Sequence, residues 1–391
     1  MLDSIFIALS GLRGHQRGLD VISHNVANMN TPGFKGSTVG FADILGPDGG
    51  RSGAQDAAGG GGLAAPRTTL DLRAGDTQQT GRDLDLALEG DGSFVFRDAE
   101  GALRYGRGGA FEFDARGRLV GRGHGLQVLA RAPGGALEPI ALDGLSLSAP
   151  NATTELRLTG NLSSTATEHA IDPLVVYDRL GGAHTLRLAF TRAAAAGLER
   201  WTVQASEAGR ALDQAVLEFA GGRPLAGAAP LKLRLDLGPA ERSEVALVLG
   251  PEVSSFSSGS SSTLALDTQD GHASGSIATL GFDAGGRLQV GYSNGRTASG
   301  ARLVLAELHD DGGLQPLGEG LFGHAGGQAP RLREAGEDVR VKGGTLELSN
   351  VDLTREFGAL ILMQRGYQAS SQVLGTANQM LQELFALGGR R

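Results

Sequence analysis

Hydrophobic positions recur every seven residues at both ends of the chain. Near the N-terminus the repeat comprises Ile5, Leu12, Leu19 and Val26, with Ile22 three residues after Leu19. Near the C-terminus the same spacing connects Leu353, Leu360, Tyr367, Leu374 and Leu381, with Met363 and Leu384 three residues after Leu360 and Leu381. Such repeats predict helices that need a partner helix. The two ends therefore most simply pair with each other or with neighbouring copies, and these residues are candidate coiled-coil and inter-subunit contacts.

Turn and capping signals set the expected limits of both helices. The first helix is expected over residues 2–28. Pro32 and Gly33 occupy the second and third positions of the turn at residues 31–34, which predicts a type II turn. The last helix is expected to begin at residue 350 or 351, with Asn350 as its N-cap and Glu347 and Asp352 placing negative charge near its start.

Apolar and polar residues alternate in the middle of the chain, which predicts strands. Leu84, Leu86 and Leu88 alternate with other residues, and the alternation is strict from Leu231 to Leu237. Residues 49–65 are rich in glycine and predict a flexible connector.

We therefore expect an α+β fold in which two mainly antiparallel β-domains are nested between paired terminal helices. Residues 1–35 with 350–391 form the inner coiled-coil domain, and residues 36–75 form the Gly-rich connector. Residues 76–150 with 276–349 form the first β-domain, and residues 151–275 form an inserted outer β-domain.

Composition narrows the function. A chain of 391 residues has room for two or three domains, and its net charge of -8 argues against general nucleic-acid binding. No apolar run is long enough to predict membrane insertion, and the first residues lack the basic region of a secretory signal peptide. The absence of cysteine excludes disulfides and thiol chemistry.

The residues that could carry chemistry are scattered. The eight histidines form no HExxH motif, and the glycines at 121, 123 and 125 precede no helix pattern that would indicate a nucleotide site. We expect no catalytic residue, no metal and no cofactor, and hence no enzyme. A β-domain adhesin or other binding module is a further alternative, but Trp201 is the single tryptophan available for an aromatic platform.

Both ends carry long motifs that resemble those of the flagellar axial family, which comprises rod, hook and hook-associated proteins. The N-terminal motif lies within residues 19–35 and contains Asn25, Asn28, Asn30, Thr31, Gly33 and Phe34. The C-terminal motif contains Ser349, Asn350, Val351, Asp352, Gln364, Arg365, Tyr367 and Gln368. Residues 84–94 resemble the start of the family's first β-domain. Gly366 and Ser370 depart from the family, which commonly carries Asn at both positions.

Several internal segments resemble hook members more closely than rod members. They are residues 152–162, 176–186 and 292–296, and the insertion and total length agree with a hook subunit. The sequence around Pro32 is more similar to rod members, so a distal rod subunit is the alternative within the family.

The resemblance implies a structural subunit that assembles with copies of itself into a curved, flexible tube. Such a tube would transmit torque from rod to filament and enclose an export channel. The implied partners are the distal rod protein, the hook cap protein, the hook-filament junction protein and the flagellar type III export apparatus. The implied location is the extracellular flagellum, reached without a cleaved signal peptide.

Overall fold

The computed structural model describes residues 2–45, 60–63, 67–132, 134–193, 199–225, 231–238, 241–309, 313–326, 329–336 and 338–388. The chain divides into two compact units. Unit 1 comprises Met1–Asp143, Leu280–Gln289 and Ser299–Arg391, and unit 2 comprises Gly144–Thr279 and Val290–Ala298. Residues 144–150, 276–279 and 290–298, which the sequence places in the first β-domain, thus group with unit 2.

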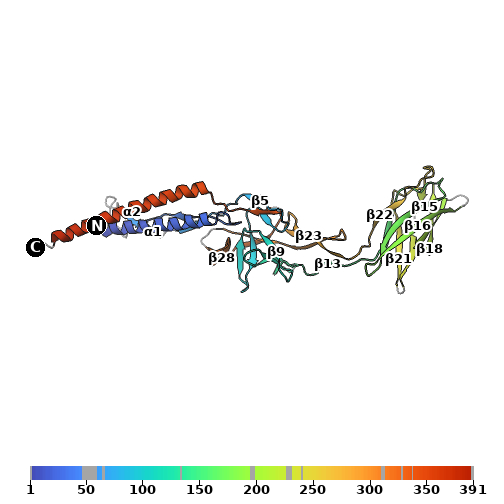
Figure 1. Ribbon diagram of the computed structural model, residues 1–391, viewed down its shortest axis with the longest axis horizontal. Coiled ribbons are helices and arrows are strands. Elements are labelled where there is room, and N and C mark those ends of the chain that lie inside the picture. Colours follow the sequence, from blue (N-terminus) through green and yellow to red (C-terminus); the bar gives the residue numbers. More distant parts are fainter. Residues whose placement is uncertain are drawn as a thin grey trace. The chain divides into compact units, whose positions relative to one another are not determined.

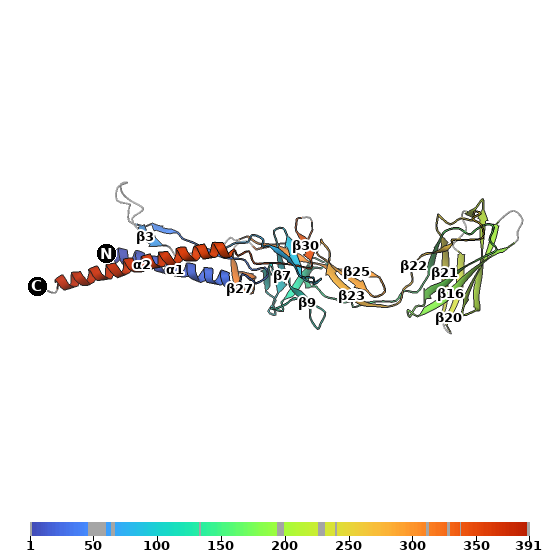
Figure 2. The same ribbon diagram turned by 45° about the horizontal axis from the view of Figure 1, so that its top comes forward.

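Two helices at the ends of the chain pack side by side in unit 1, as predicted. Helix α1 spans Leu2–Ala27 and α2 spans Leu353–Gly388 (Figures 1 and 2). Their backbones approach closely because small residues line the contact. A Cβ atom added at Gly11 would lie 2.9 Å from the Ser370 hydroxyl, and one added at Gly18 would lie 2.8 Å from the Met363 sulfur. Larger side chains at these two positions would therefore require Ser370 or Met363 to shift.

The turn after α1 has the predicted form. Gly33 adopts a φ of 70°, and the Phe34 amide donates to the Thr31 carbonyl at 3.2 Å. Both features belong to a type II turn, in which glycine tolerates the positive φ.

The segment expected to be a connector, residues 36–75, contains strands where it is described. Strands β1 (Ser37–Gly40) and β4 (Arg67–Leu70) pair antiparallel, as do β2 (Asp43–Leu45) and β3 (Gly60–Leu63). The Leu63 amide donates to the Ser10 hydroxyl of α1 at 3.1 Å. Strand pairing gives the backbone N–H and C=O groups of this segment hydrogen-bond partners, which its glycine-rich composition did not predict. Most of the predicted Gly-rich stretch, residues 49–65, lies outside the described residues.

The remainder of unit 1 is built around a ten-stranded sheet. Its main path runs β27-β28-β8-β7-β11-β10-β9, with β12, β26 and β29 attached. The strands are β7 (Ser93–Arg97), β8 (Leu103–Gly106), β9 (Phe111–Phe113), β10 (Leu119–Gly121), β11 (Gln127–Arg131), β12 (Leu137–Pro139), β26 (Val304–Glu307), β27 (Leu314–Gly318), β28 (Leu321–His324) and β29 (Arg331–Glu334). Phe94, Val95 and Phe96 of β7 are all fully buried, so this strand is covered on both faces.

Two short antiparallel pairs join residues far apart in the sequence. Strand β6 (Leu86–Glu89) pairs with β30 (Arg340–Gly343), and β5 (Thr77–Gln79) pairs with β31 (Thr345–Glu347). All three residues from Leu86 to Leu88 are buried, although their sequence suggests alternation. Because β31 lies shortly before α2, these pairs fix the start of that helix on the β-domain.

Unit 2 contains two sheets around one apolar core. One sheet has the order β15-β16-β17-β18-β19 and the other β20-β21-β14-β22. Their strands are β14 (Glu155–Thr159), β15 (Glu168–Tyr177), β16 (Ala183–Ala193), β17 (Glu199–Glu207), β18 (Arg210–Ala220), β19 (Arg223–Pro224), β20 (Leu231–Gly238), β21 (Glu241–Leu249) and β22 (Ala265–Gln269). Both sheets contribute to the core, with Phe190 and Trp201 from the first and Leu158 and Leu247 from the second. We call this part the sandwich.

A further four-stranded sheet has the order β13-β23-β24-β25. Its strands are β13 (Leu147–Ser148), β23 (Gly275–Phe282), β24 (Arg287–Tyr292) and β25 (Thr297–Arg302).

Strand pairs in the sandwich are mostly antiparallel. The antiparallel pairs are β14 with β22, β15 with β16, β16 with β17, β17 with β18 and β20 with β21, whereas β14 and β21 are parallel. The predominance of antiparallel pairs agrees with the predicted fold class.

A histidine between two carboxylates makes the stability of the sandwich depend on pH. His184 Nδ1 lies 2.9 Å from Glu207, and its Nε2 lies 3.4 Å from Asp178. Burial lowers the pKa of His184, but the hydrogen bonds and charges of Glu207 and Asp178 outweigh burial, so the pKa is raised. This contribution to stability is complete below the pKa of an unfolded histidine, about 6.5, and is lost as pH rises through the raised folded value.

We therefore expect the sandwich to unfold at a higher denaturant concentration at pH 6 than at pH 8. Fluorescence of Trp201, which lies in the sandwich core, reports this transition. His184→Gln is expected to flatten the difference between the two pH values. An unchanged difference in that variant would assign the pH dependence to another group.

Candidate functional site

Most of the predicted helix-pairing residues are at least half-buried on the two paired helices. Ile22 is buried, and Ile5, Leu12, Leu19 and Val26 are half-buried on α1. On α2 the half-buried positions are Leu353, Leu360, Met363, Leu374 and Leu381. The side chain of Leu384 lies outside the described residues. Which of them contact the other helix and which contact neighbouring copies stays a prediction.

Tyr367 departs from that pattern. Its side chain is 40% exposed, whereas the neighbouring Gly366 is less exposed and lies against the His15 ring of α1. The missing side chain at Gly366 leaves room for the imidazole. Tyr367 is therefore turned aside from the helix contact that its heptad position predicts.

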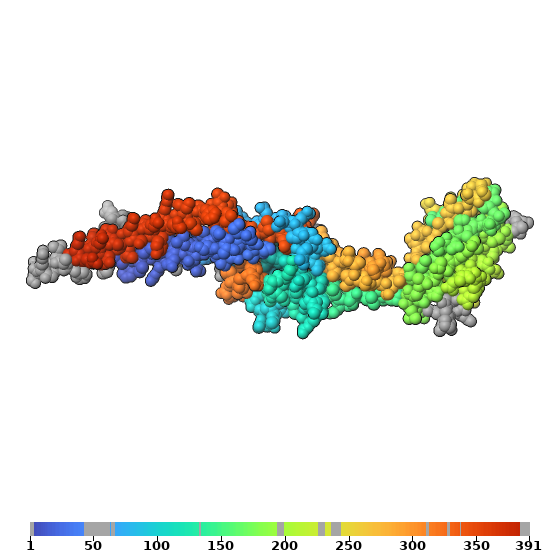
Figure 3. All heavy atoms as spheres, viewed as in Figure 1, coloured from blue at the N-terminus to red at the C-terminus, as the bar shows by residue number. Residues whose placement is uncertain are grey.

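A second set of apolar residues on α2 faces away from α1. We call Leu362, Ala369, Val373 and Met380 the apolar stripe. Their separations of seven, four and seven residues place them on one side of a helix. Leu362 is 67% exposed, Val373 52% and Met380 46%. Figure 3 shows α2 packed along α1, with part of the α2 surface open on the face in view. Leucine, valine and methionine at this exposure favour a protein contact.

Asn25 attaches the end of α1 to strand β1. Its side-chain amide donates to the Ser37 carbonyl at 2.8 Å, and its oxygen accepts from the Ser37 amide at 3.0 Å. Asn25 is 1% exposed. The buried Asn25 carboxamide therefore hydrogen-bonds to both backbone groups of Ser37, as a neighbouring strand would.

Replacing Asn25 by Ala is expected to lower the free energy of unfolding of unit 1 by about 1–3 kcal/mol, because the partly buried backbone amide and carbonyl of Ser37 lose their partners. Far-ultraviolet circular dichroism during denaturation reports the helices, which lie in unit 1. Asn30→Ala is the matched control, since Asn30 is exposed and its loss should change stability by less than about 0.5 kcal/mol. Equal effects of the two substitutions would refute the role of Asn25.

Asn350 does not cap α2, contrary to the prediction. Its side-chain oxygen accepts from the Gly36 amide at 2.8 Å, and its amide donates to the carbonyls of Asp71 and Arg73. Asp352 takes the capping position and accepts from the amides of Thr354 and Arg355 at 2.8 and 3.2 Å. Two carboxylate bonds satisfy the free amides of the first turn, which leaves Asn350 to join distant segments.

A buried ion network lies beside these amide contacts. Glu347 accepts from the Lys35 ammonium at 2.6 Å and from the Gly75 amide at 2.9 Å, and lies 3.3 Å from Arg107 Nε. The three charged residues are between 1% and 4% exposed. Burial lowers the pKa of Lys35, while the hydrogen bond and the charge of Glu347 oppose this change. The network joins the motif after α1 to the strand before α2. The sequence predicted that Glu347 places negative charge at the start of the last helix. In the structure it binds Lys35 and the Gly75 amide instead.

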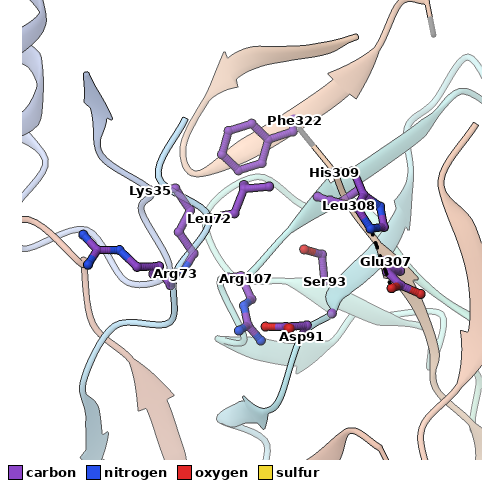
Figure 4. Close-up of a pocket in the computed structure, with 11 residues that line it drawn as sticks. Lys35, Leu72, Arg73, Asp91, Ser93, Arg107, Glu307, Leu308, His309 and Phe322 are labelled. Carbon is purple, nitrogen blue, oxygen red and sulfur yellow. Dashed lines mark hydrogen bonds and ion pairs between the residues drawn. The ribbon is translucent and has the colours of Figure 1, made fainter. Parts of the chain in front are cut away.

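A cavity of about 300 Å³ opens next to the network. Figure 4 shows Lys35, Arg107 and Ser93 around it, together with the apolar side chains of Leu72 and Phe322. Its lining is of mixed charge, since Asp91 and Glu307 also contribute. In the part of the chain that the structure describes, no group of three or more His, Asp or Glu side chains could hold a metal ion.

The other motif residues divide between the junction and the helix surface. Phe34 is buried, Gly33 donates its amide to the Glu347 carbonyl at 2.8 Å, and Thr31 donates to the Asn28 side chain. The Ser349 hydroxyl accepts from the Val351 amide at 3.3 Å. Gln364, Arg365 and Gln368 are exposed on α2. The N-terminal motif and the first part of the C-terminal motif thus meet at one junction. The later residues of the C-terminal motif, which lie further along α2, are not part of it.

Sequence reasoning missed the ion network and the apolar stripe. Lys35 and Glu347 are 312 residues apart, and no spacing rule relates them. The stripe could have been found as a second apolar repeat beside the heptads. Neither helix, within the residues described, has the combination of length and apolarity needed to cross a membrane.

The chain is similar to flagellar proteins along its whole length. A family model described as flagellar basal body rod FlgEFG protein C-terminal matches residues 342–387, and one described as flagella basal body rod protein matches residues 5–35. Flagellar hook protein FlgE of Escherichia coli (strain K12) is 28% identical, with 97% of this chain and 98% of that protein covered. The FlgE of Borreliella burgdorferi is 29% identical, with 99% of this chain and 100% of that protein covered.

Solved structures also align, among them the crystal structure of Helicobacter pylori flagellar hook protein FlgE2. The alignment covers 68% of this chain and 99% of that chain, with 12% identity and a TM-score of 0.46, which is too low to support an argument.

Proposed function

We infer that this chain, which belongs to the family of flagellar rod and hook proteins, is a structural subunit of the flagellar hook that polymerises with copies of itself. The observation that carries this conclusion is the match to hook proteins over nearly the full length of both chains. The family models at the two ends coincide with the helices and the junction motifs. The relatives are named as hook proteins and not as enzymes.

The polymer is a curved, flexible tube that transmits torque from the rod to the filament and encloses an export channel. Residues 1–35 with 350–391 form its inner coiled-coil layer, where subunits meet through helix surfaces such as the apolar stripe. Exposed Leu362 and Val373 support this assignment, because they have no apolar cover within the described chain. The β-rich residues outside this layer form the rest of the tube wall.

Buried charge at the junction suits a subunit under mechanical load. The ion pairs of Glu347 with Lys35 and Arg107 are directional, so they form only over a narrow range of distances and angles. Asn25 and Asn350 add amide bonds to the same junction. A helix pair held in this way can pass force to its β-domain without sliding.

The subunit contacts the distal rod protein at one end of the tube and the hook-filament junction protein at the other. The hook cap protein accompanies growth. The type III export apparatus delivers the chain to the extracellular hook without a cleaved signal peptide. The family membership supports these assignments.

Electron microscopy of basal bodies from cells lacking the gene tests the proposal. The expected result is rods that end without a hook or filament, with hooks restored by the gene supplied in trans. Truncated rods would instead assign the chain to the distal rod, which the rod family models at both ends leave as the second candidate. Normal hooks would refute both assignments and favour a separate binding module.

A further inference from the structure

The hairpin of β24 and β25 places one asparagine between two segments that are distant in the sequence. Asn294, in the turn of this hairpin, donates to the Ser148 hydroxyl at 3.1 Å and to the Ala273 carbonyl at 2.9 Å. Its side-chain oxygen accepts from the Arg296 amide at 3.1 Å. The carboxamide therefore contacts three separate stretches of unit 2.

These stretches have a defined place in the chain. Ser148 lies on the segment through which the chain enters the sandwich before β14, and Ala273 lies on the segment through which it leaves after β22. Any tension between the sandwich and the rest of the protein must pass along these two segments, because they are its only covalent connections. Their lateral attachment is therefore mechanically important.

Backbone pairing between the two segments is sparse. Strand β13 pairs with β23 only through Leu147 with Ser276 and Ser148 with Gly275. One further bridge joins Asn151 and His272. Asn294 bonds to side-chain and backbone atoms between these two points of pairing, where the ladder is interrupted.

The surroundings are shaped around the carboxamide. A Cβ atom added at Gly275 would lie 2.6 Å from the Asn294 side-chain carbon, so a glycine is needed there. The same hairpin makes two further bonds to the segments. The Tyr292 hydroxyl donates to the Leu145 carbonyl at 2.8 Å, and the Ser276 amide donates to the Ser293 hydroxyl at 3.1 Å.

We propose that Asn294 is a clip that holds together the two segments through which the chain enters and leaves the sandwich. It acts as a positioning residue through the contacts of its amide nitrogen with Ser148, His272 Nδ1 and Ala273. A carboxylate at this position would keep the acceptor for Arg296 but would lose both donors and would face the Ala273 carbonyl. The proposal concerns the folded single chain and does not depend on hook assembly.

Hydrogen exchange of the full chain tests the clip. In Asn294→Ala and Asn294→Asp, the amides of Asn151, His272 and Ser276 are expected to exchange at least about tenfold faster than in the parent chain. Gly275→Ala should produce the same pattern with Asn294 intact, because the added carbon displaces the carboxamide. Amides of the sandwich core and the unfolding transition reported by Trp201 should not change.

Ser299→Ala is the matched control, because it removes a side-chain hydrogen bond to Gln289 within the same hairpin without touching the two segments. Parent-like exchange in Asn294→Ala, or retained protection in Asn294→Asp, would overturn the proposal. Equal acceleration in Ser299→Ala, or a shifted Trp201 transition in the Asn294 variants, would also overturn it, because the effect would then not be specific to the clip.

Discussion

Replacing Glu347 by Ala is expected to destabilise unit 1 by about 3–5 kcal/mol, because the substitution leaves the buried cations Lys35 and Arg107 without their counter-ion. The Gly75 amide loses its acceptor as well. The circular dichroism transition of the helices should move to lower denaturant concentration. The Trp201 transition of unit 2 should stay in place, which separates this effect from general misfolding.

Glu334 provides the matched control for this substitution. It pairs with Arg302 at 3.2 Å, but the two side chains are 41% and 36% exposed. Surface pairs of this kind contribute about 0–1 kcal/mol, so Glu334→Ala should have little effect. A loss below about 1 kcal/mol in Glu347→Ala would mean that the junction relaxes to solvate its cations, and the network would then not hold the junction.

Replacing Val373 by Asp is expected to abolish tube formation while leaving the isolated subunit folded. Val373 is 52% exposed, so a carboxylate there is hydrated in the single chain and should change its stability by less than about 0.5 kcal/mol. In a polymer the same carboxylate would be buried against apolar side chains without a partner, at a cost of several kcal/mol per subunit. Sedimentation and electron microscopy of seeded purified protein measure the outcome.

Gln379→Asp is the control for the apolar stripe. It adds the same charge to an exposed polar position of α2 outside the stripe. We expect this variant to form tubes. Assembly of Val373→Asp at the parent rate, or equal failure of both variants, would refute the assignment of the stripe as a contact between copies.

The sequence by itself determined the elements with strong periodicity. The heptads of Leu12, Leu19, Leu360 and Leu374 required two long helices, since an apolar stripe of that period is stable only against another helix. The turn at Gly33 was also determined locally, because its conformation depends on a glycine at that position. In the sandwich, strict alternation around Leu233 and Leu235 identified the strand and its buried face.

The partners of polar residues were decided only by the tertiary structure. Local rules offered Asn350 as a helix cap and Glu347 as a terminal charge, and both residues instead bind segments hundreds of positions away. The same holds for Asn294 and its two segments. Hydrogen bonds and ion pairs depend on which chain segments are neighbours in space. Apolar periodicity predicts the helices and strands, but it does not predict which of them are neighbours.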